Sequence, residues 1–256
     1  MNTATRALVR RPSPRLAEGE VTHVARQPLD VPLAREQHAA YLQVLRAHGL
    51  LLIELPELPD HPDAVFVEDT LVMLDGRALL TRPGAASRRG ELESVEATLR
   101  MLRLPLERIQ APATLDGGDV LVLSRHVLVG QSTRTDAAAL EQLAALVRGT
   151  GRVVVSVEVR GMLHLKSAIT ALPNGTLIAV PDAVDSARLR ALGYPVQYAV
   201  EPSAGDVLCL GQTVVLPLDA PETARALRHQ GFEVVCVDIG ELQKIEAGVT
   251  CMSVLL

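Results

Sequence analysis

VEDTLVMLDGRALLTRPG, residues 67–84, contains two apolar runs separated by a turn, and this pattern returns three more times along the chain. It returns as GGDVLVLSRHVLVGQS at 117–132, LHLKSAITALPNGTLIAVPD at 163–182 and AGDVLCLGQTVVLPLD at 204–219. Two of the turns, Asp75-Gly76 and Asn174-Gly175, are strong hairpin signals between β-rich runs. Self-similarity at intervals of 40 to 50 residues indicates a repeat architecture in which each unit begins with a β-hairpin.

Between the hairpins, the sequence predicts a helix followed by a further strand. Apolar residues recur every three or four positions in these stretches, as expected for one buried face of a helix. The expected helices are Glu91–Leu102, Ala137–Val147 and Pro221–His229, and the expected strands are Arg152–Val157 and Phe232–Val237. Each repeat therefore has the order ββαβ.

The two ends of the chain supply a fifth unit. A C-terminal strand within Gly248–Leu256 would pair with Arg6–Arg10, followed by a helix at His38–His48 and a strand at Leu50–Glu54. Closing a ring in this way leaves no open sheet edge. We therefore predict an α/β fold with a single domain, residues 1–256, built from five ββαβ pseudo-repeats around a central axis. The alternative is a doubly wound parallel sheet, which would not need the hairpins.

The composition restricts the class of protein. The 256 residues carry a formal charge of −5 and are 48% hydrophobic, as in globular domains, and no basic cluster favours a nucleic-acid partner. No apolar stretch approaches the roughly 18 residues of a membrane helix, and the N-terminus lacks the apolar core of a signal peptide. Cys209, Cys236 and Cys251 are odd in number and lack CxxC spacing, so we expect free thiols in the cytoplasm and no metal site.

Charged and nucleophilic residues gather where the hairpins begin. In a ring of such units these positions converge on the central axis. The residues are Asp63, Glu68, Asp69, Asp116, Asp119, His164, Lys166 and Cys251.

Taken singly, each of these residues has an ordinary structural interpretation. Cys251 alone resembles a packed small hydrophobe, His164 a hydrogen-bonded core histidine, and Glu68-Asp69 the cap of a turn. Together they suit one chemistry. Carboxylates bind a planar guanidinium through paired charged hydrogen bonds. A thiolate can attack the guanidinium carbon, and a histidine can protonate the departing amine and then activate water.

Five motifs in the expected order give the chain a family resemblance. They are FVED at 66–69, TRPGAASRR at 81–89, ATLDGGDVL at 113–121, LHLKS at 163–167 and TCMSVLL at 250–256. With these motifs the chain resembles the dimethylarginine dimethylaminohydrolases, a family of the guanidine-modifying superfamily, the penteins. The resemblance covers nearly the whole chain and implies a five-bladed α/β propeller. It also implies no metal or organic cofactor, and it is compatible with a homodimer.

The resemblance implies the catalytic roles. Cys251 would attack the guanidinium carbon and form a covalent thiouronium intermediate, with His164 as general acid and base and Asp116 orienting His164. Glu68 and Asp69 would hold the guanidinium. The residue after the nucleophile is Met252, where some relatives carry a second cysteine.

The resemblance also implies contacts with the rest of the substrate. Arg88 and Arg134, which the residues alone would indicate as solvated arginines, would bind the α-carboxylate, and Asp63 would lie near the α-amino group. The remaining implied contacts are Phe66 in the FVED motif and backbone groups near Leu16, in a mobile loop, and Ile245.

The implied reaction is hydrolysis of Nω-methylated arginine to citrulline and a methylamine. An arginine deiminase or related guanidine hydrolase is the main alternative, because the same carboxylate, histidine and cysteine groups serve both, and a methyl group changes binding by only about 1–3 kcal/mol. The absence of an inserted helical domain and the match of the FVED and TCMSVLL motifs favour the methylated substrate. A non-catalytic propeller that binds other proteins is a further alternative, which the presence of Cys251 and His164 disfavours.

Overall fold

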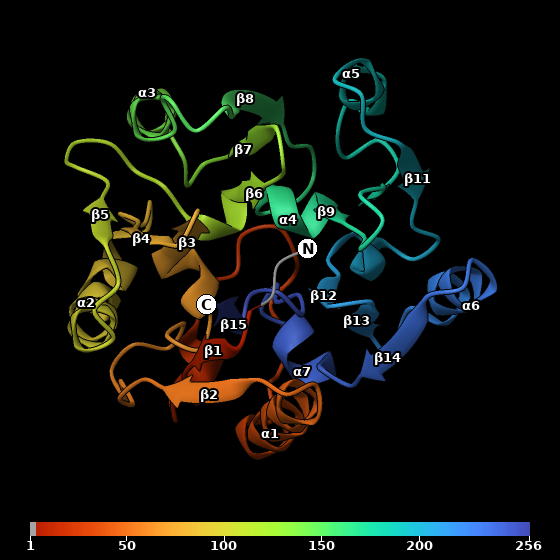
Figure 1. The fold of residues 1–256 in the computed structure, drawn as a ribbon. Helices are drawn as coiled ribbons and strands as arrows, with labels where there is room; N and C mark the ends of the chain where they lie inside the picture. Colours follow the sequence, from red (N-terminus) through yellow and green to blue (C-terminus); the bar gives the residue numbers. More distant parts are fainter. Residues whose placement is uncertain (1–3) are drawn as a thin grey trace.

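The computed structural model describes residues 4–256, which form a ring of five three-stranded sheets (Figure 1). In each sheet the middle strand pairs antiparallel with the strand nearer the axis and parallel with the outer strand. The doubly wound alternative is wrong, because no continuous sheet runs through the described residues. The sheets are β3 (Leu71–Leu74), β4 (Arg77–Leu80) and β5 (Leu106–Arg108); β6 (Val120–Val122), β7 (His126–Gln131) and β8 (Val153–Glu158); β9 (Ile169–Ala171), β10 (Leu177–Ala179) and β11 (Val196–Tyr198); β12 (Leu208–Leu210), β13 (Thr213–Pro217) and β14 (Glu233–Val237); and β15 (Ser253–Leu255), β1 (Arg6–Val9) and β2 (Leu51–Glu54).

The fifth sheet joins the two ends of the chain, as the sequence predicted. Strand β1 pairs antiparallel with β15, placing Ala7 opposite Leu255, and parallel with β2, placing Ala7 opposite Leu52. The ring is thus closed by hydrogen bonds between segments that lie about as far apart in sequence as the chain allows. This arrangement confirms the five-repeat α/β propeller.

One helix in each unit lies on the outside of the ring (Figure 1). These helices are α1 (Val31–Ala47), α2 (Leu92–Met101), α3 (Ala137–Leu146), α5 (Ser186–Ala191) and α6 (Pro221–His229). The predicted start of the first helix at His38 is wrong, because the helix begins at Val31. The side chain of Asp30 accepts a hydrogen bond from the Leu33 amide at 3.0 Å, and Pro32 lies in the first turn, so the helix has a standard N-terminal cap. None of the helices in the described part of the chain has the length and apolar character needed to cross a bilayer.

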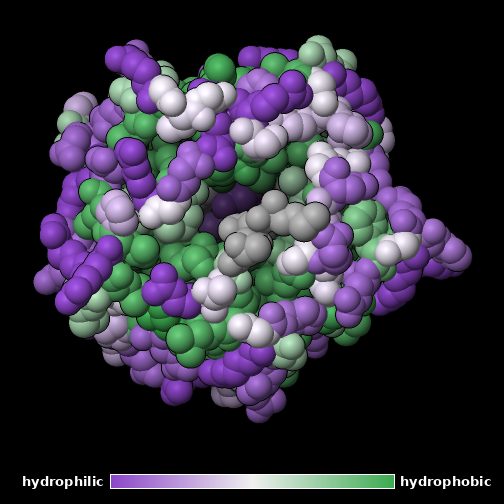
Figure 2. Space-filling model, in the orientation of Figure 1, coloured by the Kyte–Doolittle hydropathy of each residue, from purple (hydrophilic) through white to green (hydrophobic). Residues whose placement is uncertain are grey.

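Short helical turns precede the inner strands of four units. They are η2 (Val67–Thr70), η4 (Gly117–Asp119), α4 (Leu165–Ala168) and η5 (Pro202–Gly205). In the fifth unit Cys251 lies in a turn before β15, because this strand begins only at Ser253. These turns bring the polar residues of the repeats toward the axis, where this face of the molecule is hollowed (Figure 2).

Three other short helices lie within residues 4–256: η1 (Leu16–Glu18), η3 (Ala86–Glu91) and α7 (Gly240–Gln243). The hydrophobic core consists of five clusters of buried residues, the largest of which joins β1, α1 and the segment before β15. Cys251 packs in this cluster and also lines a polar cavity.

Candidate active site

A small cavity near the axis collects residues from four of the five units. Its volume is about 30 Å³, which is room for one or two water molecules. Nine of the eleven residues predicted for the site line it, and Leu16 and Glu68 do not. The lining residues are Glu20, Asp63, Phe66, Asp69, Arg88, Asp116, Arg134, Leu163, His164, Ile245, Glu246, Ala247 and Cys251.

The thiol of Cys251 lies in a buried and negatively charged environment. The residue is 8% exposed, and its Sγ accepts a hydrogen bond from the Gly248 amide at 3.4 Å. Burial raises the pKa of this thiol well above its ordinary value, and the nearby carboxylates Asp206, Glu68 and Asp69 raise it further. The group is therefore a neutral thiol at neutral pH and needs a nearby positive charge to become a thiolate.

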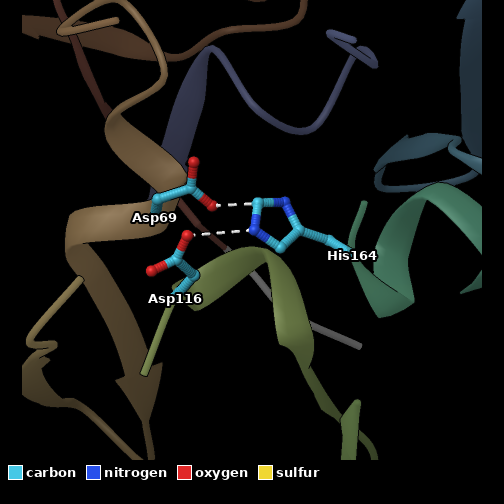
Figure 3. Close-up of side chains that lie close together, drawn as sticks. All are labelled: Asp69, Asp116 and His164. Atoms are coloured by element: carbon cyan, nitrogen blue, oxygen red, sulfur yellow. Dashed lines mark hydrogen bonds and ion pairs between the residues drawn. The ribbon is translucent and has the colours of Figure 1, made fainter. Parts of the chain in front are cut away.

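His164 lies at the start of α4, and its imidazole points toward the carboxylates of Asp69 and Asp116 (Figure 3). Its Nε2 is 3.0 Å from Asp116 Oδ2, and its Nδ1 is 3.7 Å from Asp69 Oδ1. Burial alone would lower the pKa of His164. The charge of Asp69, the hydrogen bond to Asp116 and the charge of Asp119 outweigh burial and raise this pKa to about 9. At neutral pH His164 is thus an imidazolium, which can act as a general acid.

The ligand atoms of Asp69, Asp116 and His164 lie within 4.8 Å of one another, a spacing that could hold a metal ion. A metal ligand must be a neutral imidazole, whereas both carboxylates here stabilise its protonated form. The geometry therefore suits a proton held on His164 better than a metal.

Two glycines allow the turns to approach one another this closely. A Cβ atom on Gly118 would lie 2.7 Å from His164 Nδ1 and 2.8 Å from Asp69 Oδ1, and one on Gly117 would lie 2.0 Å from the Glu68 carbonyl oxygen. All three distances are too short for real contacts, so the Gly117-Gly118 pair of the LDGGD motif is required for close approach.

Asp69 is held by a buried arginine. Arg88 Nη1 pairs with Asp69 Oδ2, while Arg88 Nε and Nη2 donate to Glu91 at 2.9 and 2.8 Å. Nη2 also donates to the carbonyl oxygens of Asp63 and Phe66. Burial alone would raise the pKa of Asp69, but the charges of His164 and Arg88 lower it, so Asp69 remains ionised. The interpretation of Arg88 as a solvated arginine is wrong, because its guanidinium is buried and engaged on several sides.

Glu68 lies beneath the cavity and does not line it. Its Oε1 is 2.6 Å from Lys166 Nζ, and its Oε2 accepts from Thr250 Oγ1 at 2.7 Å. Thr250 also contacts Asp206, with its Oγ1 3.1 Å from Oδ2 and its amide 3.0 Å from Oδ1. Burial raises the pKa of both carboxyl groups, and the charge of Glu68 helps to raise that of Asp206 to about 7.

One part of the cavity lining holds the guanidinium of Arg134 and two carboxyl groups, those of Glu20 and Asp63. Arg134 Nη2 lies 2.7 Å from Glu20 Oε2, and Asp63 accepts hydrogen bonds from the Glu20 amide at 3.1 and 3.2 Å. Arg134 is buried, so the interpretation of a solvated arginine is wrong here too. Leu16 is fully buried in the largest core cluster, and its contact with a substrate remains a prediction.

Sequence reasoning missed four residues that line the cavity: Glu20, Leu163, Glu246 and Ala247. Leu163 and Glu246 flank His164 and Ile245, so adjacency to predicted residues could have found them. Glu20 lies four residues after Leu16, within the same loop.

Comparisons with known proteins agree on one family. The sequence model of "N,N dimethylarginine dimethylhydrolase, eukaryotic" matches residues 29–192. The chain is 47% identical to the N(G),N(G)-dimethylarginine dimethylaminohydrolase of Streptomyces coelicolor, over 98% of this chain and 96% of that protein. It is 33% identical to the enzyme of the same name from Pseudomonas aeruginosa, over 96% of this chain and 97% of that one.

Solved structures give the same result. A Cys-to-Ser mutant of the Pseudomonas aeruginosa enzyme in complex with citrulline superposes with a TM-score of 0.92 at 31% identity, covering 99% of both chains. A dimethylarginine dimethylaminohydrolase adduct with S-methyl-L-thiocitrulline superposes with a TM-score of 0.93 at 31% identity, covering 99% of this chain and all of the other. The N-terminal domain of ArgZ, a cyanobacterial arginine dihydrolase, shares the fold with a TM-score of 0.82 at 18% identity, covering 98% of this chain and 97% of that one.

Proposed function

Because this chain belongs to the dimethylarginine dimethylaminohydrolase family, we propose that it is a hydrolase that converts Nω-methylated arginine to citrulline and a methylamine. The observation that carries the proposal is that the thiol of Cys251 lines one cavity with the imidazole of His164, whose Nε2 lies 3.0 Å from Asp116 Oδ2. This arrangement supports the assignment of Cys251 as the nucleophile and of His164 as the proton donor, with the carboxylate of Asp69 in the same cavity.

The proposed reaction begins when the cationic guanidinium enters the cavity. Its charge lowers the pKa of Cys251, and the thiol loses its proton to solvent. The thiolate adds to the guanidinium carbon, and His164 gives its proton to the departing amine, which leaves a thiouronium on Cys251. His164, now neutral, takes a proton from water as the water attacks the same carbon. Collapse of this adduct breaks the carbon–sulfur bond, the sulfur of Cys251 takes up the hydroxyl proton and becomes a thiol again, and citrulline is released.

The remaining residues bind and orient the substrate in this proposal. Asp69 accepts hydrogen bonds from the guanidinium, and Glu68 adds negative charge from beneath. Arg134 binds the α-carboxylate. Arg88 contributes charge at that end, but its bonds to Glu91 and Asp69 make it chiefly a positioning residue for Asp69.

The substrate backbone is bound by the other predicted residues. Asp63 accepts a hydrogen bond from the α-amino group, and Phe66 and Ile245 border the aliphatic chain of the substrate. The loop at Leu16 closes over the substrate. We further propose that the protein acts in the cytoplasm as a homodimer, on a small molecule and without a nucleic-acid or membrane partner. The three free cysteines and the net charge of −5 support this setting.

The test is citrulline release measured side by side from Nω,Nω-dimethylarginine, Nω-methylarginine and arginine. We expect kcat/KM for the methylated substrates to exceed that for arginine. A strong preference for arginine would replace the proposal with a deiminase. No citrulline from any of the three would exclude both activities.

A further inference from the structure

Glu20 contacts both residues that we propose to bind the α-amino and α-carboxylate groups of the substrate, Asp63 and Arg134. Its backbone amide donates to the two carboxylate oxygens of Asp63 at 3.1 and 3.2 Å. Its own carboxylate lies 2.7 Å from Arg134 Nη2. Asp63 and Arg134 are the residues to which we assign the α-amino and α-carboxylate groups. One residue of the chain therefore makes both contacts that an amino acid would make there.

The carboxylate of Glu20 has the charge needed to compete with a substrate carboxylate. Ser87 Oγ donates to Glu20 Oε1 at 2.5 Å. Burial alone would raise the pKa of Glu20, but the Ser87 hydrogen bond and the charge of Arg134 outweigh burial and lower it. Glu20 is thus an anion at neutral pH, and it pairs with Arg134. The other nearby cation, Arg88, already pairs with Glu91 and Asp69.

The segment that carries Glu20 is also held by Glu246, another residue that lines the cavity. The carboxylate of Glu246 accepts hydrogen bonds from the backbone amides of Thr22 at 3.1 Å, His23 and Val24 at 3.0 Å. Glu246 itself has a φ of 67°, a left-handed conformation that non-glycine residues adopt at a cost. Residues 20–24 are therefore held at Glu20 by Asp63 and Arg134 and at residues 22–24 by Glu246.

The size of the cavity agrees with an occupied subsite. With Glu20 in place about 30 Å³ remains, whereas pockets for small-molecule ligands have volumes of roughly 300–1,000 Å³. A free amino acid that reaches Asp63 and Arg134 must therefore compete with Glu20 for both residues.

We infer that Glu20 is a specificity-determining residue: its carboxylate competes with the α-carboxylate of the substrate for Arg134, and its amide competes with the α-amino group for Asp63. This inference rests on the proposed function. Binding of the substrate then requires that the ion pair between Glu20 and Arg134 be replaced by one between the substrate α-carboxylate and Arg134. The apparent affinity for an amino acid equals the intrinsic affinity multiplied by the fraction of molecules in which Glu20 has released Arg134.

The test is calorimetric binding of citrulline and of 4-ureidobutylamine, which is citrulline without its carboxylate. Three proteins are compared: the unchanged chain, Glu20→Gln, and the control Glu18→Gln. Glu18 is exposed in the same loop and pairs with Arg15 outside the cavity. We expect Glu20→Gln to bind citrulline about fivefold more tightly than the unchanged chain does. We expect no gain in affinity for 4-ureidobutylamine, because it has no carboxylate and does not compete with residue 20 for Arg134. Glu18→Gln should bind both ligands as the unchanged chain does.

Two outcomes would overturn the inference alone: unchanged or weaker citrulline binding by Glu20→Gln, or an equal gain for both ligands, which would indicate a general opening of the loop. Citrulline binding by none of the three proteins would overturn the proposed amino-acid site, and this inference with it. Turnover of dimethylarginine by the unchanged chain, measured separately, distinguishes a failure of the proposed reaction from a failure of the role of Glu20.

Discussion

Nε2 of His164 lies 3.0 Å from Oδ2 of Asp116, and this pair spans two blades of the ring. The other oxygen of Asp116 accepts from the Gly84 amide at 2.9 Å, so the carboxylate cannot rotate away without losing both bonds. The contact fixes the imidazole and raises the pKa of His164 together with Asp69 and Asp119.

The first prediction concerns Asp116→Asn. The pKa of His164 is about 9, above its ordinary value of 6.5, so the imidazolium persists until the pH rises through about 9. Removing the charge of Asp116 lowers this pKa, and the basic limb of the kcat profile should move to lower pH by about one unit. Replacing Asp136, which caps α3 away from the cavity, with Asn is the control. An unchanged basic limb in Asp116→Asn would contradict the assignment of His164 as the general acid.

The same pKa shift has a consequence for stability. A histidine whose pKa is higher in the folded than in the unfolded protein stabilises the fold fully below about pH 6.5. That contribution is lost as the pH rises through about 9. Urea unfolding of the unchanged chain and of His164→Gln should therefore differ more at pH 6 than at pH 9.5. If the difference in unfolding free energy between the two proteins grew toward alkaline pH, the raised pKa of His164 in the folded protein would be contradicted.

The third prediction concerns the protonation of Cys251. Because burial and three nearby carboxylates raise the pKa of the thiol, iodoacetamide should inactivate the free enzyme slowly at pH 7 and faster at alkaline pH. Loss of activity reports Cys251, while peptide mass spectrometry accounts for Cys209 and Cys236. Cys251→Ser should abolish turnover and leave the circular dichroism spectrum unchanged. Rapid inactivation at pH 7 would mean that the thiolate is already formed.

A fourth prediction follows from the Thr250 hydroxyl, which lies between Glu68 and Asp206. A hydroxyl has one hydrogen, so it can donate to only one carboxylate, and the other contact needs a proton on a carboxyl group. The pKa of Asp206, about 7, is consistent with such a shared proton, and Lys166, Cys251 and Tyr41 are the other titratable groups that face Asp206.

Above pH 7 the charge of Asp206 opposes ionisation of Cys251. Asp206→Asn removes that charge and keeps the shape, so the pH midpoint of iodoacetamide inactivation should fall by about one unit. Asp219→Asn, at an exposed aspartate, is the control. A midpoint that rises or stays constant in Asp206→Asn would show that Asp206 does not influence the thiol.

The fold could be predicted from the sequence because its signals are local. Asp75-Gly76 and Asn174-Gly175 define hairpins, and helix α6 has the predicted bounds because Pro221 and Gly231 delimit it. The start of α1 was missed because the apolar pattern is weak before His38, although the Asp30 cap marks it.

The site was predictable where motifs identify residues and not where long-range contacts decide their roles. Arg88, in η3, pairs with Glu91 in the same helix and with Asp69 in η2. No periodic pattern in the sequence predicts the contact between these two helices. The same holds for Glu20, whose partners Asp63 and Arg134 are distant in sequence. A charged residue in a loop is ordinarily solvated, so only the folded ring shows that this one faces the cavity.

The last prediction concerns the space beside His164. Gly118→Ala would place a Cβ atom 2.7 Å from His164 Nδ1 and 2.8 Å from Asp69 Oδ1, and neither group can retreat, because Asp116 holds the imidazole and Arg88 holds the carboxylate. We expect a fall in kcat of at least a hundredfold and a loss of about 1–3 kcal/mol in the free energy of unfolding. Gly240→Ala is the control, since a Cβ atom there would lie 3.3 Å from Asp238 Oδ1 at the surface. Both kcat and urea unfolding should be nearly unchanged in this variant. If Gly118→Ala kept full activity, the imidazole would have room to move, and the tight three-residue arrangement could not be what sets its pKa.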